Sequence, residues 1–274
     1  MWTLQQILSA IPRDLLRMAL WLVLLAAIFV PLERIFALHR QKVLRKSIYA
    51  DLGLYFLNSL LPSMLLILPL SVVAWAVHRV VPGGIYNWPT NLPFWIRQTA
   101  ALVVGEVGAY WGHRWSHEIP WLWRFHAIHH GAEQVDWLVH TRAHPFDMVF
   151  TRLCGLVPMY LLGLAQPAGG VDSVPYIVIF LGTAWGFFIH ANVKWRLGWL
   201  EEMVSTPAFH HWHHTADGPT VINKNYAALL PCVDRCFGTL HLPKQKWPDK
   251  YGIESAVGDS VEMEAEAPVP VLLH

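Results

Sequence analysis

The chain has 274 residues, of which 54% are hydrophobic and only 14% are charged, whereas about a quarter of the residues in a soluble domain are charged, so a soluble globular protein is not expected. The net charge of +1 provides no basic field for the phosphates of nucleic acid, and three cysteines cannot build a disulfide framework or a four-thiolate zinc site. The 16 histidines and 15 tryptophans stand out instead. Because histidine is the commonest metal ligand, the composition indicates a membrane protein that binds metal.

Two apolar segments in the first third of the chain are predicted to span the membrane as helices. Residues 15–38 consist almost entirely of Leu, Ala, Val, Ile and Phe, with charges near the ends, and they are long enough to cross about 30 Å of hydrocarbon. They are also too long for the core of a signal peptide. Residues 52–77 contain no charge, and Pro62 and Pro69 are tolerated in a membrane helix whose neighbours bond the freed carbonyls.

Three further helices are predicted in or at the membrane. Residues 94–112 are a weaker candidate because they include Arg97 and Glu106, whereas residues 146–165 and 174–189 form a pair that spans the bilayer or makes a shallow hairpin around the turn-rich residues 166–170. The sequence therefore predicts an all-α integral membrane protein with four to five transmembrane or membrane-embedded helices in a single domain, residues 1–253. The acidic residues 254–274 are predicted to form a disordered tail.

The loop between the first two helices predicts the orientation. Arg40, Lys42, Arg45 and Lys46 lie within a few residues of the membrane, so this side is expected to be cytoplasmic. If each later helix is counted as one membrane crossing, the chain returns to the cytoplasmic face after residue 112 and again after residue 189. The result is the same if the last two helices only dip into the bilayer. Every large group of histidines is therefore expected on the cytoplasmic face.

Most of the histidines fall into compact groups. Residues three or four positions apart stand on one face of a helix, so the imidazoles within a group point the same way. Such groups beside apolar helices indicate metal binding, because neutral imidazoles around a divalent metal avoid the cost of clustered cations. The groups are His113 and His117; His126, His129 and His130; His144; His190; and His210, His211, His213 and His214, of which His211 is expected to turn off the shared face.

Other polar residues are candidates for support around these histidines. Tyr110 and Glu106 precede the first group on the same helix face. At a rotation of about 100° per residue, their side chains and those of His113 and His117 point within about 60° of one another. Glu106 is a candidate acceptor for the outer N–H of a ligand imidazole. His140, four residues before His144, is a candidate for the same kind of role. The isolated histidines are interpreted as hydrogen-bonded or membrane-surface residues: His39, His78, His241 and His274.

The number of imidazoles indicates two metal ions. A structural zinc needs four ligands and a catalytic zinc three, so roughly nine or ten imidazoles are too many for one zinc ion. All-imidazole ligation suits iron, copper, nickel or zinc, and ligand type does not choose among them. A zinc-protease motif would need a histidine at position 121, where the chain has Trp121, so a hydrolase loses its best support.

Five histidine motifs follow one another in a fixed order along the chain. They are His-x-x-x-His from His113, His-x-x-His-His from His126, Arg-x-His-Pro from Arg142, His-x-Asn from His190 and His-x-x-His-His from His210. This order, with the flanking Thr206-Pro and Asn225-Tyr226, resembles the fatty acid hydroxylase/sterol desaturase superfamily of integral membrane di-iron enzymes. The resemblance covers about residues 50–242.

The resemblance implies two irons held by imidazoles in a His-rich helical cap over the cytoplasmic ends of a four-helix membrane core. Some relatives carry a further histidine four residues before His190, where this chain has Gly186, which leaves open the group that completes the shell of the second iron. His144 and Asn192 are the candidates. Carried onto this chain, the family ligands are His113, His117, His126, His129, His130, His190, His210, His213 and His214, with His144 as a tenth.

Such a centre, with O₂ as co-substrate, implies oxidation of an unactivated C–H bond in an acyl, alkyl or sterol-type chain of a membrane lipid. Hydroxylation is the first expectation. Desaturation or C4-methyl oxidation of a sterol-like lipid is the alternative, because sub-ångström placement of the substrate decides between them. A metal-binding or transport protein without catalysis is a distant third, since a transporter needs polar residues deep in its spans.

The electrons for such a reaction are expected from a separate protein. The chain shows no Rossmann fingerprint, haem domain or iron–sulfur motif. The resemblance implies a cytochrome b5-like, ferredoxin or reductase partner on the cytoplasmic cap. Lys224, Lys244 and Lys246 would receive an acidic donor there, or else rest on anionic lipid.

Overall fold

The computed structural model describes residues 4–165 and 173–253, and in this part of the chain every element longer than an isolated β-bridge is helical. The all-α prediction is thus confirmed for the described residues, whereas the predicted turn at 166–170 and the tail at 254–274 lie outside them. The elements are α1 (Leu4–Ile35), α2 (Ile48–Val80), α3 (Gly83–Tyr86), α4 (Phe94–Glu118), α5 (Pro120–His130), α6 (Pro145–Leu161), α7 (Ser173–His190), α8 (Pro207–His213) and α9 (Pro231–Cys236), with 3₁₀ turns η1 (Trp88–Asn91), η2 (Trp137–Thr141) and η3 (Gly198–Glu202).

Three helices in the described residues are long and apolar enough to cross a membrane, so the chain is an integral membrane protein. They are α1 over Pro12–Ile35, α2 over Ile48–Val80 and α7 over Ser173–His190. Both α1 and α2 expose large apolar side chains, such as Leu20 (62%) and Leu68 (73%), as surfaces that face lipid do. α4 and α6 form where helices were predicted but are not among the three, since α4 carries charges and α6 has only 17 residues.

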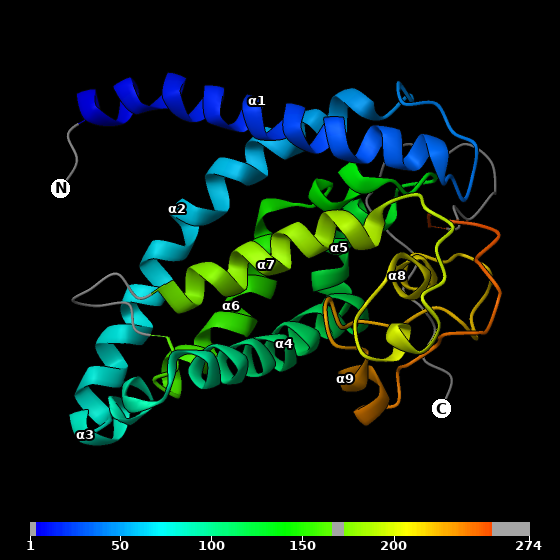
Figure 1. The fold of residues 1–274 in the computed structure, drawn as a ribbon. Coiled ribbons are helices and arrows are strands. Elements are labelled where there is room, and N and C mark those ends of the chain that lie inside the picture. Colours follow the sequence, from blue (N-terminus) through cyan, green and yellow to red (C-terminus); the bar gives the residue numbers. More distant parts are fainter. Residues whose placement is uncertain (1–3, 166–172, 254–274) are drawn as a thin grey trace.

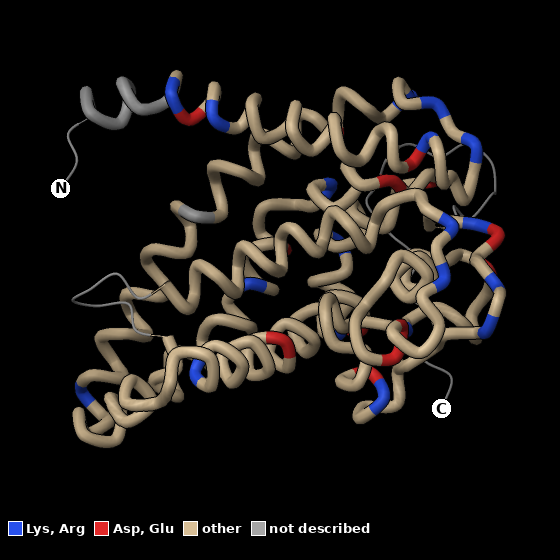
Figure 2. The backbone as a smooth tube through the Cα atoms, in the orientation of Figure 1, with Lys and Arg blue, Asp and Glu red and all other residues tan. Residues whose placement is uncertain are grey.

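The helices and the charged residues are distributed unevenly over the molecule. Figure 1 shows α8 and the loops around it gathered at one end, where the C-terminal end of α7 arrives, while α3 lies at the opposite end. Figure 2 shows Lys and Arg concentrated at the α8 end and in the loop that joins α1 to α2, with long uncharged stretches along the helices between. The polar end therefore holds the loops, and the apolar helices extend away from it.

α4 and α6 approach each other so closely that their backbones touch. A Cβ at Gly108 would overlap the carbonyl oxygen of Cys154, and a Cβ at Gly155 would lie 3.0 Å from the carbonyl oxygen of Gly105. Glycine at these positions permits the close approach. The pairing is antiparallel, so the C-terminal turns of α4, which carry the first histidine motif, lie beside the start of α6.

A buried ion network fixes the start of α2 against η2. Arg45 contacts Asp51 at 2.8 Å and Asp136 at 2.9 Å, and Arg142 contacts Asp51 at 3.1 Å. Charged side chains can be buried when each is paired with an opposite charge and hydrogen-bonded. The four side chains of this network meet that condition, and their contacts hold the two segments together. The loop between α1 and α2 was used to predict the cytoplasmic side. Because Arg45 is buried in this network, that loop exposes one positive charge fewer than its sequence suggests.

Buried carboxylates hold the chain after α8 against α4. Asp234 of α9 accepts hydrogen bonds from the backbone N–H groups of Tyr226 at 2.7 Å and Ala227 at 2.8 Å. Glu106 of α4 accepts a third bond, from the N–H of Leu229 at 2.6 Å. These bonds satisfy backbone donors of a buried loop that has no regular structure, and they determine where its carbonyl groups point.

Gly108→Ala is expected to lower the free energy of unfolding by about 1–3 kcal/mol, because the added methyl group would push α4 away from α6. Gly53→Ala on α2 is the matched control, since a Cβ there meets nothing within 4 Å. The measurement is the midpoint of thermal unfolding in detergent, followed by tryptophan fluorescence. Equal midpoints for the two variants would contradict the backbone contact between α4 and α6.

Candidate metal centre

Nine histidines from four helices converge into two clusters at the C-terminal ends of α4 and α7. Within each cluster, one ring nitrogen from every member lies within 4.8 Å of one ring nitrogen from all the others. All but one of the nine side chains are buried. The first cluster consists of His113, His117, His126, His130 and His213, and the second cluster consists of His129, His190, His210 and His214.

Two short helices contribute to both clusters. α5 gives His126 and His130 to the first cluster and His129 to the second, because successive residues on a helix are turned by about 100° and so face different neighbours. α8 and the residue that ends it divide their histidines in the same way. The clusters therefore lie side by side, with the ring centroids of His130 and His214 4.6 Å apart.

Backbone carbonyls fix the tautomer of four of these rings. In each ring Nδ1 lies within hydrogen-bond distance of a carbonyl oxygen, which can only accept, so Nδ1 carries the hydrogen. In the neutral ring Nε2 then has a free lone pair, as a metal ligand requires. The four bonds run from His113 to Tyr226 (2.7 Å), from His129 to Arg142 (3.1 Å), from His190 to Gly186 (2.7 Å) and from His213 to Lys224 (2.9 Å).

Several Nε2 atoms approach one another closely, and for one pair both tautomers are fixed by backbone carbonyls. The Nε2 atoms of His129 and His190 are 3.2 Å apart, although both are fixed as acceptors. The Nε2 atoms of His113 and His126 are also 3.2 Å apart, and Nε2 of His117 is buried with no hydrogen-bond partner in the described residues. Facing lone pairs repel one another, whereas a cation between them attracts both. This donor set fits a metal ion in each cluster.

Burial keeps the rings uncharged. It is the largest cause that lowers the pKa of His129, His130 and His210 well below the usual value, and the neighbouring imidazoles lower the pKa further. The same causes act on His213 and His214. Because neutral imidazole is the form that binds metal, the clusters are ready for a metal ion at neutral pH without loss of protons.

A carboxylate that the sequence analysis missed holds one of the rings. Asp147, in the first turn of α6, accepts hydrogen bonds from Nδ1 of His126 at 2.9 Å and from Oγ of Ser116 at 3.0 Å. A carboxylate behind a ligand imidazole orients the ring and raises its basicity. The sequence signal for Asp147 was weak, because an acidic residue in a first helical turn is equally explained by the helix dipole.

Two histidines of the motifs lie outside the clusters. His144, implied as a tenth ligand, accepts a hydrogen bond from the backbone N–H of Phe146 at 3.1 Å and thereby caps α6, and its ring packs on Phe125. His211 contacts Tyr251 and the carbonyl oxygen of Ala191, at 2.7 Å and 3.1 Å. It is turned off the shared face, as expected.

Glu106 and Tyr110 contact the loop behind the first cluster rather than an imidazole. Glu106 accepts a second backbone bond, from the N–H of Leu230 at 3.0 Å, and the hydroxyl of Tyr110 bonds that of Thr239 at 2.9 Å. Glu106 thus fixes the segment that follows Tyr226, and Thr239 in turn donates to Asp234, which accepts the backbone N–H of Tyr226. The two residues therefore act on the cluster through this loop.

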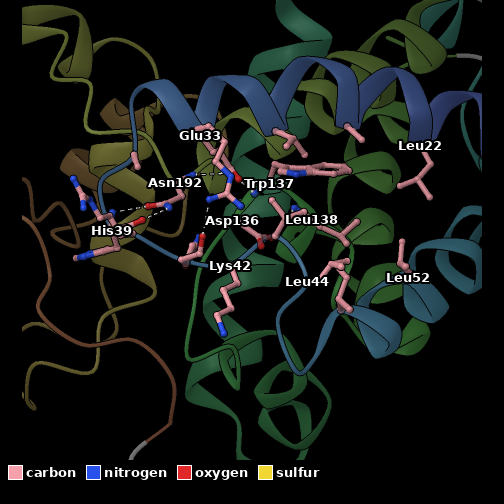
Figure 3. Close-up of a pocket in the computed structure, with 18 of the residues that line it drawn as sticks. Leu22, Glu33, His39, Lys42, Leu44, Leu52, Asp136, Trp137, Leu138 and Asn192 are labelled. Atoms are coloured by element: carbon pink, nitrogen blue, oxygen red, sulfur yellow. Dashed lines mark hydrogen bonds between the residues drawn. The ribbon is translucent and has the colours of Figure 1, made fainter.

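Asn192 joins the end of α7 to the loop after α1 (Figure 3). Its Oδ1 accepts from the N–H of His39 at 3.0 Å, and its Nδ2 donates to the carbonyl oxygen of His39 at 2.7 Å. The backbone N–H of Asn192 donates to Glu33 at 2.9 Å. Both polar atoms of the side chain are thus used in holding the loop.

His140 fills the space beside Gly186. A Cβ at Gly186 would overlap the imidazole of His140, whose ring centroid is 5.5 Å from that of His190 in the second cluster. Burial, with help from the positive charge of Arg152, lowers the pKa of His140 to about 4. An imidazole therefore stands beside the second cluster even though the chain has glycine at 186.

A cavity of about 280 Å³ opens against both clusters. Its walls come mainly from α4, α6 and α7, with apolar side chains such as Leu102, Leu156 and Ile179. A molecule held in it would lie next to both groups of imidazoles. The clustered histidines that line it are His113, His126, His129, His190 and His210.

Comparison with known families agrees with this site. The sequence profile of the family described as fatty acid hydroxylase matches residues 98–239, a stretch that contains all nine clustered histidines. The chain belongs to the fatty acid hydroxylase family, and the resemblance inferred from the motifs, to membrane enzymes with a non-haem di-iron centre, is confirmed. No solved structure matches the chain significantly.

Several characterised proteins are similar to the chain over this region, and they differ in reaction. The chain spans about half the length or less of each of them. They include the ornithine lipid hydroxylase OlsE of Rhizobium tropici (37% identical over 175 residues, 62% of this chain and 49% of that protein), the alkylglycerol monooxygenase of Homo sapiens (30% over 175 residues, 64% and 36%) and the Delta(7)-sterol 5(6)-desaturase erg3C of Aspergillus fumigatus (24% over 185 residues, 58% and 52%).

His130→Ala and His190→Ala are each expected to lower the bound metal from two ions per chain toward one, because each removes a donor from one cluster. His78→Ala, at an exposed position in the last turn of α2, is the control and should bind as much metal as the wild type. Elemental mass spectrometry of the purified proteins measures the ratio. Wild-type metal content in both cluster variants would contradict the assignment of ligands.

Asp147→Asn is expected to weaken metal binding by about 10–100-fold, because the amide carries no charge to hold the N–H of His126. Asp249→Asn makes the same change at an exposed position. Competition with a chelator of known affinity measures the difference. Identical chelator curves for the two variants would show that the carboxylate does not support the ligand.

Proposed function

We propose that the protein is a lipid hydroxylase that uses O₂ and two iron ions, held by the nine clustered histidines, to add one oxygen atom at an unactivated C–H bond of a membrane lipid. The observation that carries this proposal is the cavity between α4, α6 and α7 that ends at histidines of both clusters. Bound iron would supply the activation of O₂. The residues of the chain bind the lipid, place one of its carbons and exclude water.

The walls of the cavity suit a hydrocarbon segment. Leu102, Met159 and Val178 belong to the membrane-side helices and line the space away from the clusters. Each methylene that leaves water for such a site contributes about 0.8 kcal/mol to binding. Binding of this kind holds the lipid in place, and the polar end of the cavity then determines which carbon faces the histidines.

A second, larger pocket is not the site of oxidation. It has a volume of about 790 Å³ and lies between α1, the loop after it, the start of α2 and η2. Figure 3 shows Glu33, His39, Lys42 and Trp137 among its lining residues. None of the nine clustered histidines lines it, so a molecule bound there would be separated from the metal centre.

The names of the relatives favour hydroxylation over desaturation. The ornithine lipid hydroxylase and the alkylglycerol monooxygenase are 37% and 30% identical to this chain, whereas the sterol desaturase is 24% identical. Desaturation of a sterol-like lipid is the second candidate, because that relative shares the same region of the chain. The two reactions differ in product mass, which makes the choice measurable.

The proposal includes a membrane orientation and an electron donor. The clusters would face the cytoplasm, since Arg40, Lys42 and Lys46 follow α1 at the same end of the molecule as α8. α4 and α6 would complete the membrane core beside the three apolar helices. A cytochrome b5-like, ferredoxin or reductase partner would dock at this face, where Lys244 and Lys246 are exposed.

The purified protein is expected to contain two iron ions per chain, and cells that express it are expected to accumulate a lipid class heavier by one oxygen atom. Elemental mass spectrometry and lipid mass spectra of cells with and without the protein provide the measurements. His213→Ala is the matched control and should yield neither product nor full metal content. A lipid lighter by two hydrogen atoms would establish desaturation instead, and absence of bound metal after expression in iron-rich medium would contradict the proposal.

A further inference from the structure

Arg152 brings a positive charge without a partner to the wall of the cavity. It lies on α6 and lines the cavity together with Thr151 and Thr183. No hydrogen bond or ion pair joins its guanidinium group to any of the described residues. Asp147, the other charged residue of α6 in this cavity, is already bonded to His126.

Two other arginines of the described chain that are shielded from solvent have carboxylate partners. Arg45 contacts Asp51 at 2.8 Å, and Arg196 contacts Glu201 at 2.9 Å. Removing a charge from water without a partner is costly, so a shielded arginine in an apolar cavity of a membrane protein indicates an anion that binds there. No described residue neutralises Arg152, which is consistent with an anion that binds beside it in the cavity.

Helix geometry favours a position of the guanidinium group toward the end of the cavity that the histidines line. Arg152 follows Asp147 by five residues, which is about 7.5 Å along a helix that rises 1.5 Å per residue. Side chains on a helix lean toward its N-terminus, and the N-terminus of α6 is the end beside the clusters. The charge of Arg152 also acts on His140, which stands next to His190 of the second cluster.

We propose that Arg152 binds an anionic oxygen group of the lipid substrate, a carboxylate or a phosphate, and so determines which carbon is oxidised. A guanidinium group presents its N–H donors in a planar fork that matches the two oxygens of such a group. This inference rests on the proposed function, since it identifies the class of lipid that the same cavity accepts. Thr151 and Thr183, which also line the cavity, carry hydroxyl groups that can act as neutral donors.

The position of Arg152 limits the site of oxidation. A lipid whose anionic group sits on Arg152 has only its nearest carbons within reach of the histidine-lined end of the cavity. The oxidised carbon therefore lies within a few bonds of the anionic group. The terminal carbons of a long acyl chain point away from the clusters, along the apolar walls.

Binding of matched lipids to the purified, metal-loaded protein in detergent tests this inference. N-oleoylglycine and its methyl ester differ by one carboxylate charge, and oleoyl lysophosphatidate and 1-oleoylglycerol differ by one phosphate. The wild type is expected to bind at least one of the two acids about 10-fold or more tightly than its neutral counterpart, because hydrogen bonds between charged groups are lost in the neutral lipid. The acid with the larger preference identifies the group as carboxylate or phosphate.

Arg152→Gln is expected to remove this preference and to leave the affinity for the neutral lipids unchanged. Arg124→Gln, at an exposed position on α5, makes the same change outside the cavity and should keep the preference. Arg152→Lys keeps the charge and should retain much of it. Metal content and the unfolding midpoint establish that each variant is folded, and the comparison of acid with neutral lipid in the wild type decides the matter if Arg152→Gln does not fold.

Equal binding of acids and neutral lipids by the wild type, or a preference that survives in Arg152→Gln, would overturn the inference. The binding assay uses neither O₂ nor an electron donor, so it does not depend on turnover. An acid preference that depends on Arg152, in a protein that forms no oxidised lipid in cells, would overturn the proposed function alone. Oxidised lipid without any acid preference would overturn the role of Arg152 alone.

Discussion

The structure depends on buried imidazoles whose outer nitrogens are held by backbone carbonyl groups and whose inner nitrogens face one another. The carbonyl oxygens of Tyr226, Arg142, Gly186 and Lys224 each hold an outer N–H, and this leaves the inner nitrogens without hydrogens. The rings are buried, so water does not relieve the repulsion. A cation between two facing lone pairs attracts both, so the helices that carry the rings are arranged as two sites that are able to hold metal ions.

The polar network around the clusters holds the backbone more than it holds the rings. Glu106 and Asp234 bind N–H groups of the loop after α8, and Asp51 bridges Arg45 and Arg142. Each of these bonds positions a segment whose carbonyl oxygen then fixes an imidazole. A displaced support would rotate a ring in one of the clusters, although Glu106, Asp234, Asp51 and Arg45 make no hydrogen bond to a clustered histidine in the described residues.

Much of this could be predicted from the sequence, because periodicity and motif order are local properties. The long apolar segments became helices, and the spacing of the histidines indicated shared faces and two metals. The sequence could not show that His129 belongs to one cluster and His130 to the other, since that division depends on which helices pack on each side of α5. It also could not separate His144, which caps α6, from the clustered histidines, or find Asp147, because both positions have ordinary local explanations.

The contact between Gly186 and His140 couples these two positions. A side chain at 186 would occupy the space of the imidazole at 140, so the ring of His140 would have to move. A substitution of Gly186 would therefore act on the second cluster through His140, because the ring centroid of His140 is 5.5 Å from that of His190. Removal of the imidazole by His140→Ala would open space for a side chain at 186.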